Sequence, residues 1–443
     1  MLFVFGKMAY HRVMNKRKKV VILGAGFAGV YAYLELLKHD KKCDCIEVTC
    51  INKTDRFDFV PLAHEVATGG LLPDNTSQSI LSLPRDKDTN FIQATVAGID
   101  MDTQLINIEK VEREGSGDKQ THMLRDTPYD YMIMGLGSGV NSFGVPGVFE
   151  YALHLKDFDD ARRIKNRILD SFESAQYSTD EKKLRELLSF VVIGGGPTGV
   201  ELAGEMSDFI FGTLKKVYPS LVKKADITLV QSGPVLLGQV DKWFHKKALA
   251  ILEKKSVHVL FDRRVTKITK DSVEMGEEVM KTRNVYWTAG VKAKEIPTIS
   301  KNEISIDERS RRIHVDNFLR IPEYKNVFVA GDQGCVVDKE TGQPYPMRAQ
   351  FAVRQGIVAA QNIIADIHKK EQKEFAWKDQ GFILSLGRGG ALAQVFGVRV
   401  SGPLAWWLYR TAYLSKLVGV KAKLRTGLEW AVNLAFSRDV SRL

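Results

Sequence analysis

Long apolar runs are missing from this sequence of 443 residues. No stretch reaches the ~18 uncharged apolar residues that a membrane-spanning helix needs. The run Met1–Phe5 is too short for the core of a signal peptide, and charged residues follow it instead of preceding it. We therefore expect an intracellular chain that does not by itself conduct ions across a bilayer.

Cysteine is scarce as well: there are four, and no C-x-x-C motif. Cys43, Cys45 and Cys50 lie close together, and Cys335 is isolated. A disulfide reductase needs a redox-active cysteine pair and is excluded, and structural disulfides are not expected in a reducing compartment. The nine histidines show no metal-ligand spacing, so we expect no metal site.

Acidic residues are rare in the last part of the chain. Segment 387–443 holds nine Lys or Arg residues against Glu429 and Asp439, which gives it +7 of the net charge of +11. A basic segment indicates an anionic partner, either nucleic acid or lipid headgroups, and a solvated basic face is the simpler alternative.

The same segment is rich in aromatic and apolar residues from Gly402 onward, and these recur at steps of three and four between Leu424 and Ala435. Basic amphipathic helices with Trp and Tyr are typical of membrane surfaces. We predict a membrane-binding segment that meets anionic lipids, and a core or dimer-forming helix pair is the alternative. The Trp and Tyr content favours lipid over nucleic acid.

The rest of the chain shows one arrangement twice: a buried strand, a glycine-rich turn, a helix and a second strand. The first copy runs from Lys19 to Ile51 and the second from Phe190 to Val230. A further strand at Val327–Ala330 and a helix at Ala349–His368 follow the second copy. The sequence thus predicts an α/β fold with two Rossmann-like dinucleotide-binding domains, the second inserted in the first.

The predicted boundaries follow from this order. We expect the first domain over 18–155 and again over 301–385, the second domain over 156–300, and the membrane-binding segment over 386–443.

The first glycine motif is Gly24-Ala-Gly26-Phe27-Ala28-Gly29. Its glycines allow a tight turn, a close approach of pyrophosphate to the backbone, and close packing of helix on strand. An acidic residue usually binds ribose at the end of the next strand. Here that place holds Asn52, followed by Lys53, and an amide can still bind a ribose hydroxyl.

The second motif is Gly194-Gly-Gly196-Pro197-Thr198-Gly199-Val-Glu201, with Pro197 suited to a first helical turn. Two such sites suit hydride transfer from a nicotinamide to a flavin, and one decayed copy is the alternative. Gln231 ends the second strand. Because it offers a polar group without negative charge, we expect NADH to be used and NADPH to be tolerated.

A third group of candidates lies at other strand ends. Asp332 follows Gly331 after a buried strand, where it can accept a hydrogen bond from a ribityl hydroxyl; a solvated turn aspartate is the alternative. Gly137 and Gly290 end two more strands and are further candidates for cofactor binding.

Together these segments resemble the flavoprotein reductases with two dinucleotide-binding domains. Within them, the chain is most similar to the type II NADH:quinone oxidoreductases. Three segments indicate this: Pro61-Leu-Ala-His-Glu-Val-Ala-Thr-Gly-Gly70, Ala349-Gln-Phe-Ala-Val-Arg-Gln-Gly356, and Leu384-Ser-Leu-Gly-Arg388 with the basic tail behind it.

The resemblance implies FAD in the first domain, NADH in the second and quinone arriving from the membrane side. It places Ala349 and Gln350 near the flavin ring and Glu201 near nicotinamide and flavin. Arg354 stands where the family usually has glutamine, and Arg399 where it often has lysine. We expect Glu201, Gln350 and Arg399 to take part in catalysis, with Arg399 as a fixed charge.

We therefore predict a non-proton-pumping NAD(P)H:quinone oxidoreductase, peripheral on the cytoplasmic face of the cell membrane. A homodimer stays open. One alternative is a sulfide:quinone oxidoreductase, which requires cysteines beside the flavin. Another is a redox-sensing flavoprotein that binds nucleic acid or another partner through its basic tail.

Overall fold

Two parallel sheets organise the chain in the computed structural model, which describes residues 17–85, 89–113, 120–378 and 381–442. The run Met1–Phe5 lies outside this part. The first sheet has the order β22-β23-β9-β1-β2-β5. All neighbours in it are parallel except β22, which pairs antiparallel with β23. Its strands are β1 (Lys18–Leu23), β2 (Ile46–Asn52), β5 (Thr89–Gln93), β9 (Tyr131–Met134), β22 (Arg320–Ile321) and β23 (Tyr324–Val329).

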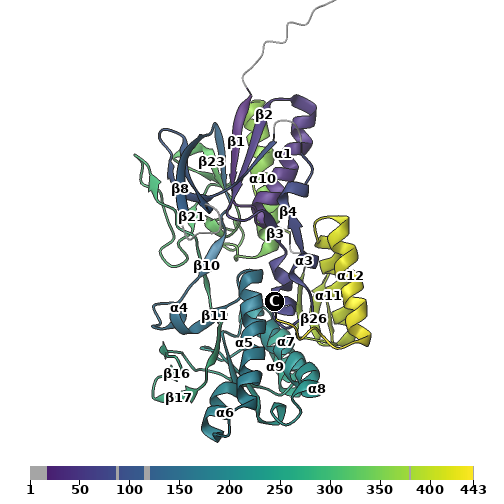
Figure 1. Cartoon of the computed structure of the whole chain (residues 1–443). Coiled ribbons are helices and arrows are strands. Elements are labelled where there is room, and N and C mark those ends of the chain that lie inside the picture. Colours follow the sequence, from purple (N-terminus) through teal and green to yellow (C-terminus); the bar gives the residue numbers. More distant parts are fainter. Residues whose placement is uncertain (1–16, 86–88, 114–119, 379–380, 443) are drawn as a thin grey trace, which may run out of the picture.

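Two helices cover the first sheet, α1 (Phe27–Cys43) and α10 (Ala349–Ile367), and they pack on each other. The close approach is possible because Gly356 has no side chain: a Cβ atom there would lie 2.1 Å from the carbonyl oxygen of Ala28. Figure 1 shows early and late parts of the chain side by side in this unit, with β1 and α1 next to β23 and α10.

The second sheet is entirely parallel, in the order β11-β18-β12-β13-β14. Its strands are β11 (Ala152–His154), β12 (Ser189–Ile193), β13 (Asp226–Val230), β14 (Val257–Leu260) and β18 (Asn284–Trp287). The accompanying helices are α5 (Phe158–Gln176), α6 (Glu181–Leu188), α7 (Pro197–Ser207) and α9 (Lys242–Lys254), and α7 continues as the π-helix η3 (Asp208–Leu214). Both predicted strand–turn–helix–strand copies are therefore present, with the second unit inserted in the first.

Two antiparallel strands mark where the chain crosses between the units, β10 (Ser138–Val140) and β19 (Val291–Ala293). β11 already belongs to the second sheet, and β20 (Thr298–Ile299) pairs with β6 (Thr95–Asp100) outside it. The strand pairing thus places the second unit within about 141–290, so the unit both begins and ends earlier than the predicted 156–300.

The C-terminal unit also begins earlier than the predicted residue 386. Its small antiparallel sheet consists of β25 (Phe382–Ser385), β26 (Ala391–Val395) and β27 (Val398–Ser401). Two helices follow, α11 (Pro403–Lys416) and α12 (Val420–Ala435). Figure 1 shows them against the side of the molecule, where α12 packs on α3 (Pro73–Thr76).

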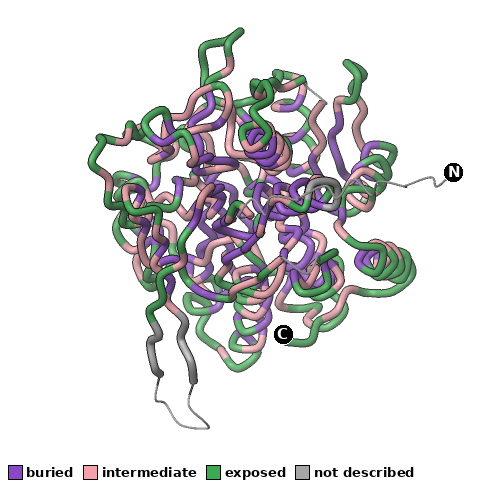
Figure 2. Tube along the Cα trace, turned by 90° about the horizontal axis from the view of Figure 1, so that it is seen from above, coloured by how far each residue is buried: buried purple, intermediate pink, exposed green. Residues whose placement is uncertain are grey.

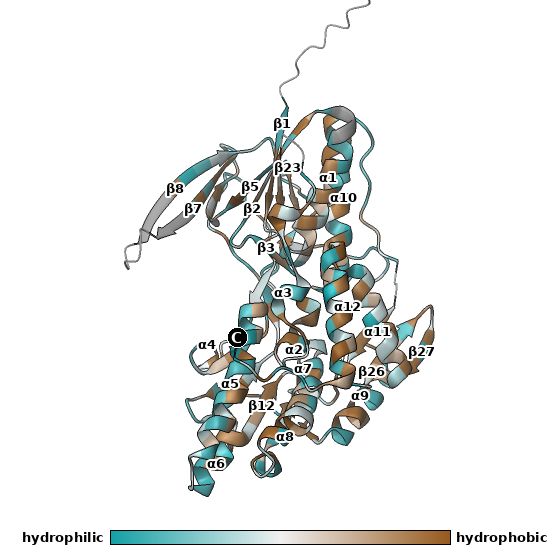
Figure 3. Ribbon diagram, turned by 45° about the vertical axis from the view of Figure 1, so that its right-hand side comes forward, coloured by the Kyte–Doolittle hydropathy of each residue, from teal (hydrophilic) through white to brown (hydrophobic). Residues whose placement is uncertain are grey.

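α12 has two different faces. Ala422, Thr426 and Trp430, at steps of four, are buried against the protein. Leu424, Leu428 and Val432 follow a second line and are exposed, and Figure 3 shows apolar residues along this helix. One face of α12 is therefore packed against the protein, as the alternative of a core helix pair predicts. The face with Leu424, Leu428 and Val432 is uncovered in the single chain. Among the described residues, no helix is both long and apolar enough to cross a membrane.

One cluster of buried apolar residues runs through both units and reaches α11, with Ile22, Phe190, Trp406 and Tyr409 among its members. In Figure 2 the buried parts of the trace gather in the interior and exposed parts surround them. This shared core fixes the C-terminal unit against both sheets. The remaining elements are β3 (Arg56–Asp58), β4 (Ser77–Ser79), β7 (Leu105–Arg113), β8 (Gln120–Pro128), β15 (Lys267–Ile268), β16 (Ser272–Met275), β17 (Glu278–Lys281), β21 (Ile313–His314), β24 (Gly334–Cys335), α2 (Ala63–Val66), α4 (Val148–Tyr151), α8 (Lys215–Val217) and the short 3₁₀ turns η1 (Val60–Leu62), η2 (Ile80–Ser82), η4 (Val222–Lys224) and η5 (Gly331–Gln333).

Candidate active site

The first glycine turn joins β1 to α1 and is shaped for a dinucleotide. Gly24 has φ +92°, and a Cβ atom on it would lie 2.5 Å from the carbonyl oxygen of Gly135. A Cβ atom on Gly29 would lie 1.8 Å from the carbonyl oxygen of Gly24. Gly26, the N-cap of α1, has open space on its side-chain side. The helix thus offers uncapped N–H groups beside free room, as a bound pyrophosphate requires.

The second glycine turn, between β12 and α7, repeats this geometry. Gly194 has φ +112°, and a Cβ atom on it would lie 2.8 Å from the backbone nitrogen of Ala289. A Cβ atom on Gly199 would lie 1.9 Å from the carbonyl oxygen of Gly194, and Gly196 again faces open space. Pro197 and Thr198 begin α7 as predicted, so both copies of the motif keep the cradle that a dinucleotide needs.

The two amides at the strand ends hold these turns. The Asn52 Oδ1 atom accepts a hydrogen bond from the N–H of Ala25 (3.0 Å), and the Gln231 Oε1 atom accepts one from the N–H of Gly195 (2.9 Å). Gln231 also donates to the carbonyl of Val235 (3.2 Å). Both residues lie where the sequence places them, but their amides are engaged with the turn backbone. Lys53 is exposed next to Asn52.

Asp332 lies in η5, where several loops meet. Its carboxylate accepts a hydrogen bond from the hydroxyl of Ser138 (2.6 Å), which also accepts one from the ammonium of Lys156 (3.0 Å). Asp332 is therefore held by a polar network, which argues against a merely solvated turn residue. Gly137 precedes this serine, and Gly290 lies at the other crossing, where the carbonyl of Gly290 accepts a hydrogen bond from the N–H of Asn141 (3.3 Å).

The first turn of α10 lies close to this place. The N–H of Gly331 donates to the Oε1 atom of Gln355 (2.7 Å), and Gln355 is buried. Ala349 and Gln350 begin the helix and are half-buried. Arg354, which stands where a glutamine is usual in the resemblance, is exposed. The buried glutamine next to it, Gln355, was not singled out by sequence reasoning.

Glu201 lies on α7 at the border with α2. Its Oε2 atom is 3.8 Å from the Nδ1 atom of His64, and its Oε1 atom accepts a hydrogen bond from the N–H of Ser385 (3.3 Å). β25 reaches α7 because Gly204 lacks a side chain: a Cβ atom there would lie 2.6 Å from the carbonyl group of Leu386. Burial, with added repulsion from Glu205 and Glu65, raises the pKa of Glu201 well above its ordinary value.

Arg399 lies apart from this cluster in its contacts. It is half exposed on β27 and forms an ion pair with Asp241 (3.1 Å) and a hydrogen bond with Gln394 (3.3 Å). The arginines that surround the carboxyl groups near Glu201 are instead Arg410 and Arg438. Among the described residues, the contacts of Arg399 are thus with Asp241 and Gln394, and its predicted part in catalysis stays a prediction.

Comparison with known proteins decides the family. A family model described as pyridine nucleotide-disulphide oxidoreductase matches residues 18–356. A type II NADH:quinone oxidoreductase of Mycobacterium tuberculosis is 29% identical over 435 residues, covering 96% of this chain and 89% of the relative. A probable NADH dehydrogenase of Dictyostelium discoideum is 30% identical over 434 residues, covering 96% and 91%. The chain belongs to the type II NADH:quinone oxidoreductases.

Solved structures agree with this type II enzyme at the level of fold. The structure of NDH2 from Plasmodium falciparum in complex with NADH has a TM-score of 0.87 at 20% identity and covers 96% of this chain and 100% of its own. The sulfide:quinone oxidoreductase of Aquifex aeolicus has a TM-score of 0.70 at 18% identity, with 92% of each chain covered.

The cysteines of this type II enzyme give no support to sulfide chemistry. Cys50 and Cys335 are free and buried, on β2 and β24. Burial raises the pKa of the Cys50 thiol to about 12 and also raises that of Cys335, so both are held as unreactive thiols. Cys45 takes part in a disulfide, which corrects the expectation that the chain has none.

Several residues of the type II enzyme near Glu201 were not predicted as site residues, although His64 and Glu65 belong to the quoted segment Pro61–Gly70. They come from distant parts of the chain: His64 and Glu65 from α2, Tyr409 and Arg410 from α11, Trp430 from α12, and Arg438 behind it. The sequence does show ionisable residues within apolar helical segments. In the C-terminal segment these residues were interpreted only as the basic side of a membrane-binding helix.

Proposed function

We propose that this chain catalyses NADH:quinone oxidoreduction with FAD in the first unit and NADH in the second, without pumping protons. Bound FAD would accept a hydride from NADH and pass two electrons to quinone. The observation that carries the proposal is the pair of dinucleotide cradles, with α7 running from the second cradle to Glu201, α2 and β25. Relatives named type II NADH:quinone oxidoreductase, aligned over 96% and 95% of this chain, support it.

The first unit supplies the groups for FAD. The turn Gly24–Gly29, with Phe27 and Ala28, would receive the pyrophosphate, Asn52 and Lys53 the adenosine ribose, and Gly331 with Asp332 the ribityl chain. Gly137 and Gly290 lie at the crossings between the units, where flavin and nicotinamide must meet. The fit rests on the open side of Gly26 and on the polar network of Asp332 with Ser138 and Lys156.

The second unit would hold the nicotinamide nucleotide through Gly194, Gly196, Pro197, Thr198 and Gly199. Gln231 would then choose between NADH and NADPH. Since it carries no negative charge, NADPH should be tolerated, although NADH is the expected substrate.

Quinone would meet the start of α10, where Ala349 and Gln350 lie. The positive end of this 19-residue helix would favour negative charge there. Glu201, kept protonated by burial, would give a proton to the reduced acceptor.

The membrane side would be the exposed face of the C-terminal unit. Exposed apolar residues occur on α11, α12 and the β26–β27 hairpin, and Lys421, Lys423 and Arg425 lie among them. Such a surface would rest on anionic lipids at the cytoplasmic face of the cell membrane, as expected for an enzyme of respiratory electron transport.

The decisive experiment measures purified protein for bound-flavin absorbance and for oxidation of NADH and NADPH with a soluble quinone. We expect flavin bleaching by NADH alone and turnover when quinone is added. Flavin reduction by sulfide and not by NADH would instead support the sulfide alternative. Co-sedimentation with anionic vesicles, set against a gel shift with DNA, tests the basic tail.

A further inference from the structure

Four carboxyl groups gather beneath the C-terminal unit, and the proposed reaction uses only that of Glu201. Glu65 comes from α2, Glu201 and Glu205 from α7, and Asp208 from η3. Glu65 and Glu205 are buried. Isolated buried carboxylates are costly, so this cluster depends on partners.

The C-terminal unit and the tail behind it supply those partners. The guanidinium of Arg438 lies 2.6 Å from the Oε2 atom of Glu205. The indole N–H of Trp430 donates to the Oε2 atom of Glu65 (2.7 Å), and the hydroxyl of Tyr409 lies 3.2 Å from the Nε2 atom of His64. Groups from α11, α12 and the tail thus complete a network that begins at Glu201.

His64 lies close to both Glu65 and Glu201. Its Nδ1 atom is 3.8 Å from Glu201, and polar side-chain atoms of His64, Glu65 and Glu205 lie within 4.8 Å of one another. One imidazole therefore lies near both the Glu65 and the Glu201 carboxyl groups, and its Nε2 atom faces the hydroxyl of Tyr409. The Arg438 guanidinium already supplies the positive charge next to Glu205, the place where a metal ion would otherwise bind.

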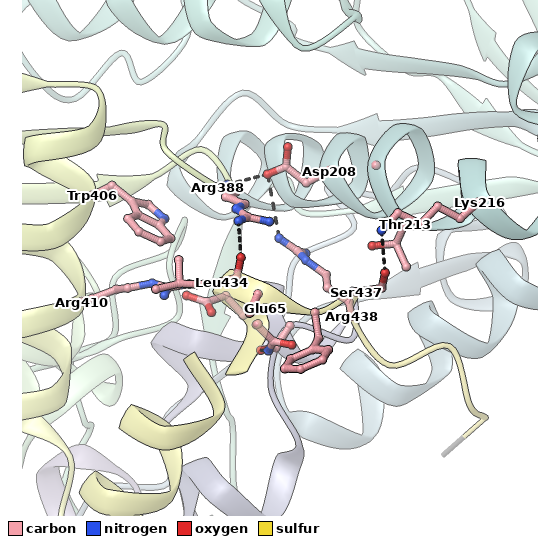
Figure 4. A pocket seen from close by; sticks show the side chains of 15 residues that line it. Glu65, Asp208, Thr213, Lys216, Arg388, Trp406, Arg410, Leu434, Ser437 and Arg438 are labelled. Carbon is pink, nitrogen blue, oxygen red and sulfur yellow. Dashed lines mark hydrogen bonds and ion pairs between the residues drawn. The ribbon is translucent and has the colours of Figure 1, made fainter. Parts of the chain in front are cut away.

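Glu65 also lines a cavity of about 280 Å³ between η3 and the chain end, here called the C-terminal cavity. Figure 4 shows its lining, which includes Asp208, Lys216, Arg388, Arg410 and Arg438. Since a water molecule occupies about 30 Å³ in the liquid, the cavity has room for several. The exposed residue Phe436 is part of the lining, so the cavity meets solvent.

We propose that Glu65 is the first proton carrier on a path that leads from the C-terminal cavity through His64 to Glu201. The proposal rests on the proposed function and adds to it the source of a proton. NADH gives up a hydride, which is two electrons and one proton, whereas quinol carries two added protons. The balance NADH + H⁺ + Q → NAD⁺ + QH₂ therefore takes one proton from water in each turnover, and Glu65 supplies it.

The electrostatics suit this role. Burial and repulsion from Glu205 raise the pKa of Glu65 to about 7, against the opposing effects of Arg410, the Trp430 hydrogen bond and Arg438. Burial lowers the pKa of His64 to about 3, so its imidazole stays neutral and can accept a proton on one nitrogen while releasing one from the other. The polar and ionisable groups around Glu65 and Glu201 come from several elements. They are His64 from α2, Glu201 and Glu205 from α7, Asp208 from η3 with its partner Lys255, Tyr409, Arg410 and Tyr413 from α11, Trp430 from α12, and Arg438 from the tail.

The test separates the two halves of the reaction in the holoenzyme. Glu65→Gln should leave flavin bleaching by NADH unchanged and slow reoxidation by a soluble quinone roughly tenfold or more, because positioned proton donors contribute on the order of 10²–10⁴-fold. The reoxidation rate of the wild type should fall as pH rises through about 7, and we call this fall the pH limb. The pH limb should be absent from Glu65→Gln and kept in Glu65→Asp. If wild type is not bleached by NADH, the proposed function is wrong whatever Glu65 does.

Glu429→Gln is the matched control. Glu429 also joins α12 to the segment after α2, through the N–H of Leu72 (2.8 Å) and the side chain of Asn75 (2.6 Å), but it lies outside the cluster. It should keep the wild-type pH profile. If Glu65→Gln and Glu429→Gln lose the pH limb equally, only the packing of α12 on the protein matters, and the proton path is refuted.

Trp430 provides a readout that does not depend on turnover. Its emission, taken as wild type minus Trp430→Phe, should show a transition near pH 7 that is absent from Glu65→Gln. If Glu65→Gln does not fold, the pH dependence of flavin reoxidation in Trp430→Phe still tests the proposal. Loss of this hydrogen bond raises the pKa of Glu65, so the reoxidation limb should move to higher pH, and an unmoved limb overturns the proposal.

Discussion

At the scale of residues, the network around Glu201 combines groups that are held away from their usual protonation states. Glu201 and Glu65 are buried carboxyl groups with raised pKa values, and His64 is a buried imidazole with a lowered one. Perturbed groups of this kind gather at functional sites because the protein accepts a cost in stability to place them. Their chemistry is therefore best tested by changes that preserve shape.

Glu201→Gln is such a change. The amide oxygen can still accept the hydrogen bond from Ser385, so FAD retention and thermal unfolding should stay near wild type. Turnover with quinone should fall roughly 10²-fold, because the amide cannot release a proton. Steady-state rates across the pH range together with the flavin-to-protein ratio check this, and kinetics that stay unchanged between about pH 5 and 9 would leave Glu201 structural.

Gln231→Glu tests the nucleotide preference. A carboxylate keeps the acceptor for the N–H of Gly195 and loses the donor to Val235, while it repels a 2′-phosphate. The ratio of kcat/KM for NADH to that for NADPH should rise roughly tenfold, equivalent to about 1.4 kcal/mol. If the ratio does not move, Gln231 acts only on the turn and does not meet the ribose.

At the scale of elements, α12 has two different faces. One line of residues packs on the protein, and Trp430 belongs to it, whereas a second line is apolar and exposed. Deleting everything after Gly402 would remove both at once, along with Tyr409 and Arg438. Substitutions on the exposed face therefore test membrane binding more cleanly than truncation does.

We expect Leu424→Glu combined with Leu428→Glu to weaken binding to anionic vesicles at least about 100-fold, because each buried leucine contributes roughly 1.5–3 kcal/mol. Turnover with a soluble quinone should not change. Leu124→Glu, at an equally exposed leucine on β8, is the control and should sediment like wild type. Sedimentation of the double variant equal to that of wild type would contradict the assignment of this face to the membrane.

At the scale of the whole molecule, the tail behind α12 fastens three parts of the chain together. Arg438 contacts Glu205 on α7 and donates to the hydroxyl of Thr68 (2.9 Å), and Asp439 pairs with the fully buried Lys165 on α5 (2.7 Å). Gly69, with φ +66°, allows this: a Cβ atom there would lie 2.3 Å from the carbonyl oxygen of Asp439. Arg438 and Asp439 thus tie the tail to α7, to the segment after α2 and to α5.

Arg438→Met should therefore destabilise the protein by about 3–5 kcal/mol, since it leaves the Glu205 carboxylate buried without its partner. Thermal unfolding followed by release of flavin should shift down by several degrees. Arg442→Met removes an exposed ion pair with Asp170, which is worth about 0–1 kcal/mol, and should change little. Similar melting of the two variants would mean that the tail does not hold the units together.

The sequence by itself determined the family, the two strand–glycine–helix cradles and the order of the units, because these are local: a turn's glycines and the strand and helix beside them lie within about 30 residues. The insertion of the second unit in the first could be predicted from the order of the strands along the chain. The strand pairing moved the boundaries of the second unit by about 10 to 15 residues, because strand partners are chosen across the sheet and not along the chain.

Only the tertiary structure decided which ionisable residues surround Glu201. Glu65 and Trp430 are 365 positions apart, and His64 and Tyr409 are 345 apart, so no spacing rule relates them. The role of Arg399 stays a prediction: in the folded chain it pairs with Asp241 on the protein side, because a matching position in a segment does not fix where its side chain points. Burial creates both the network and its altered pKa values, and burial is a property of the folded chain.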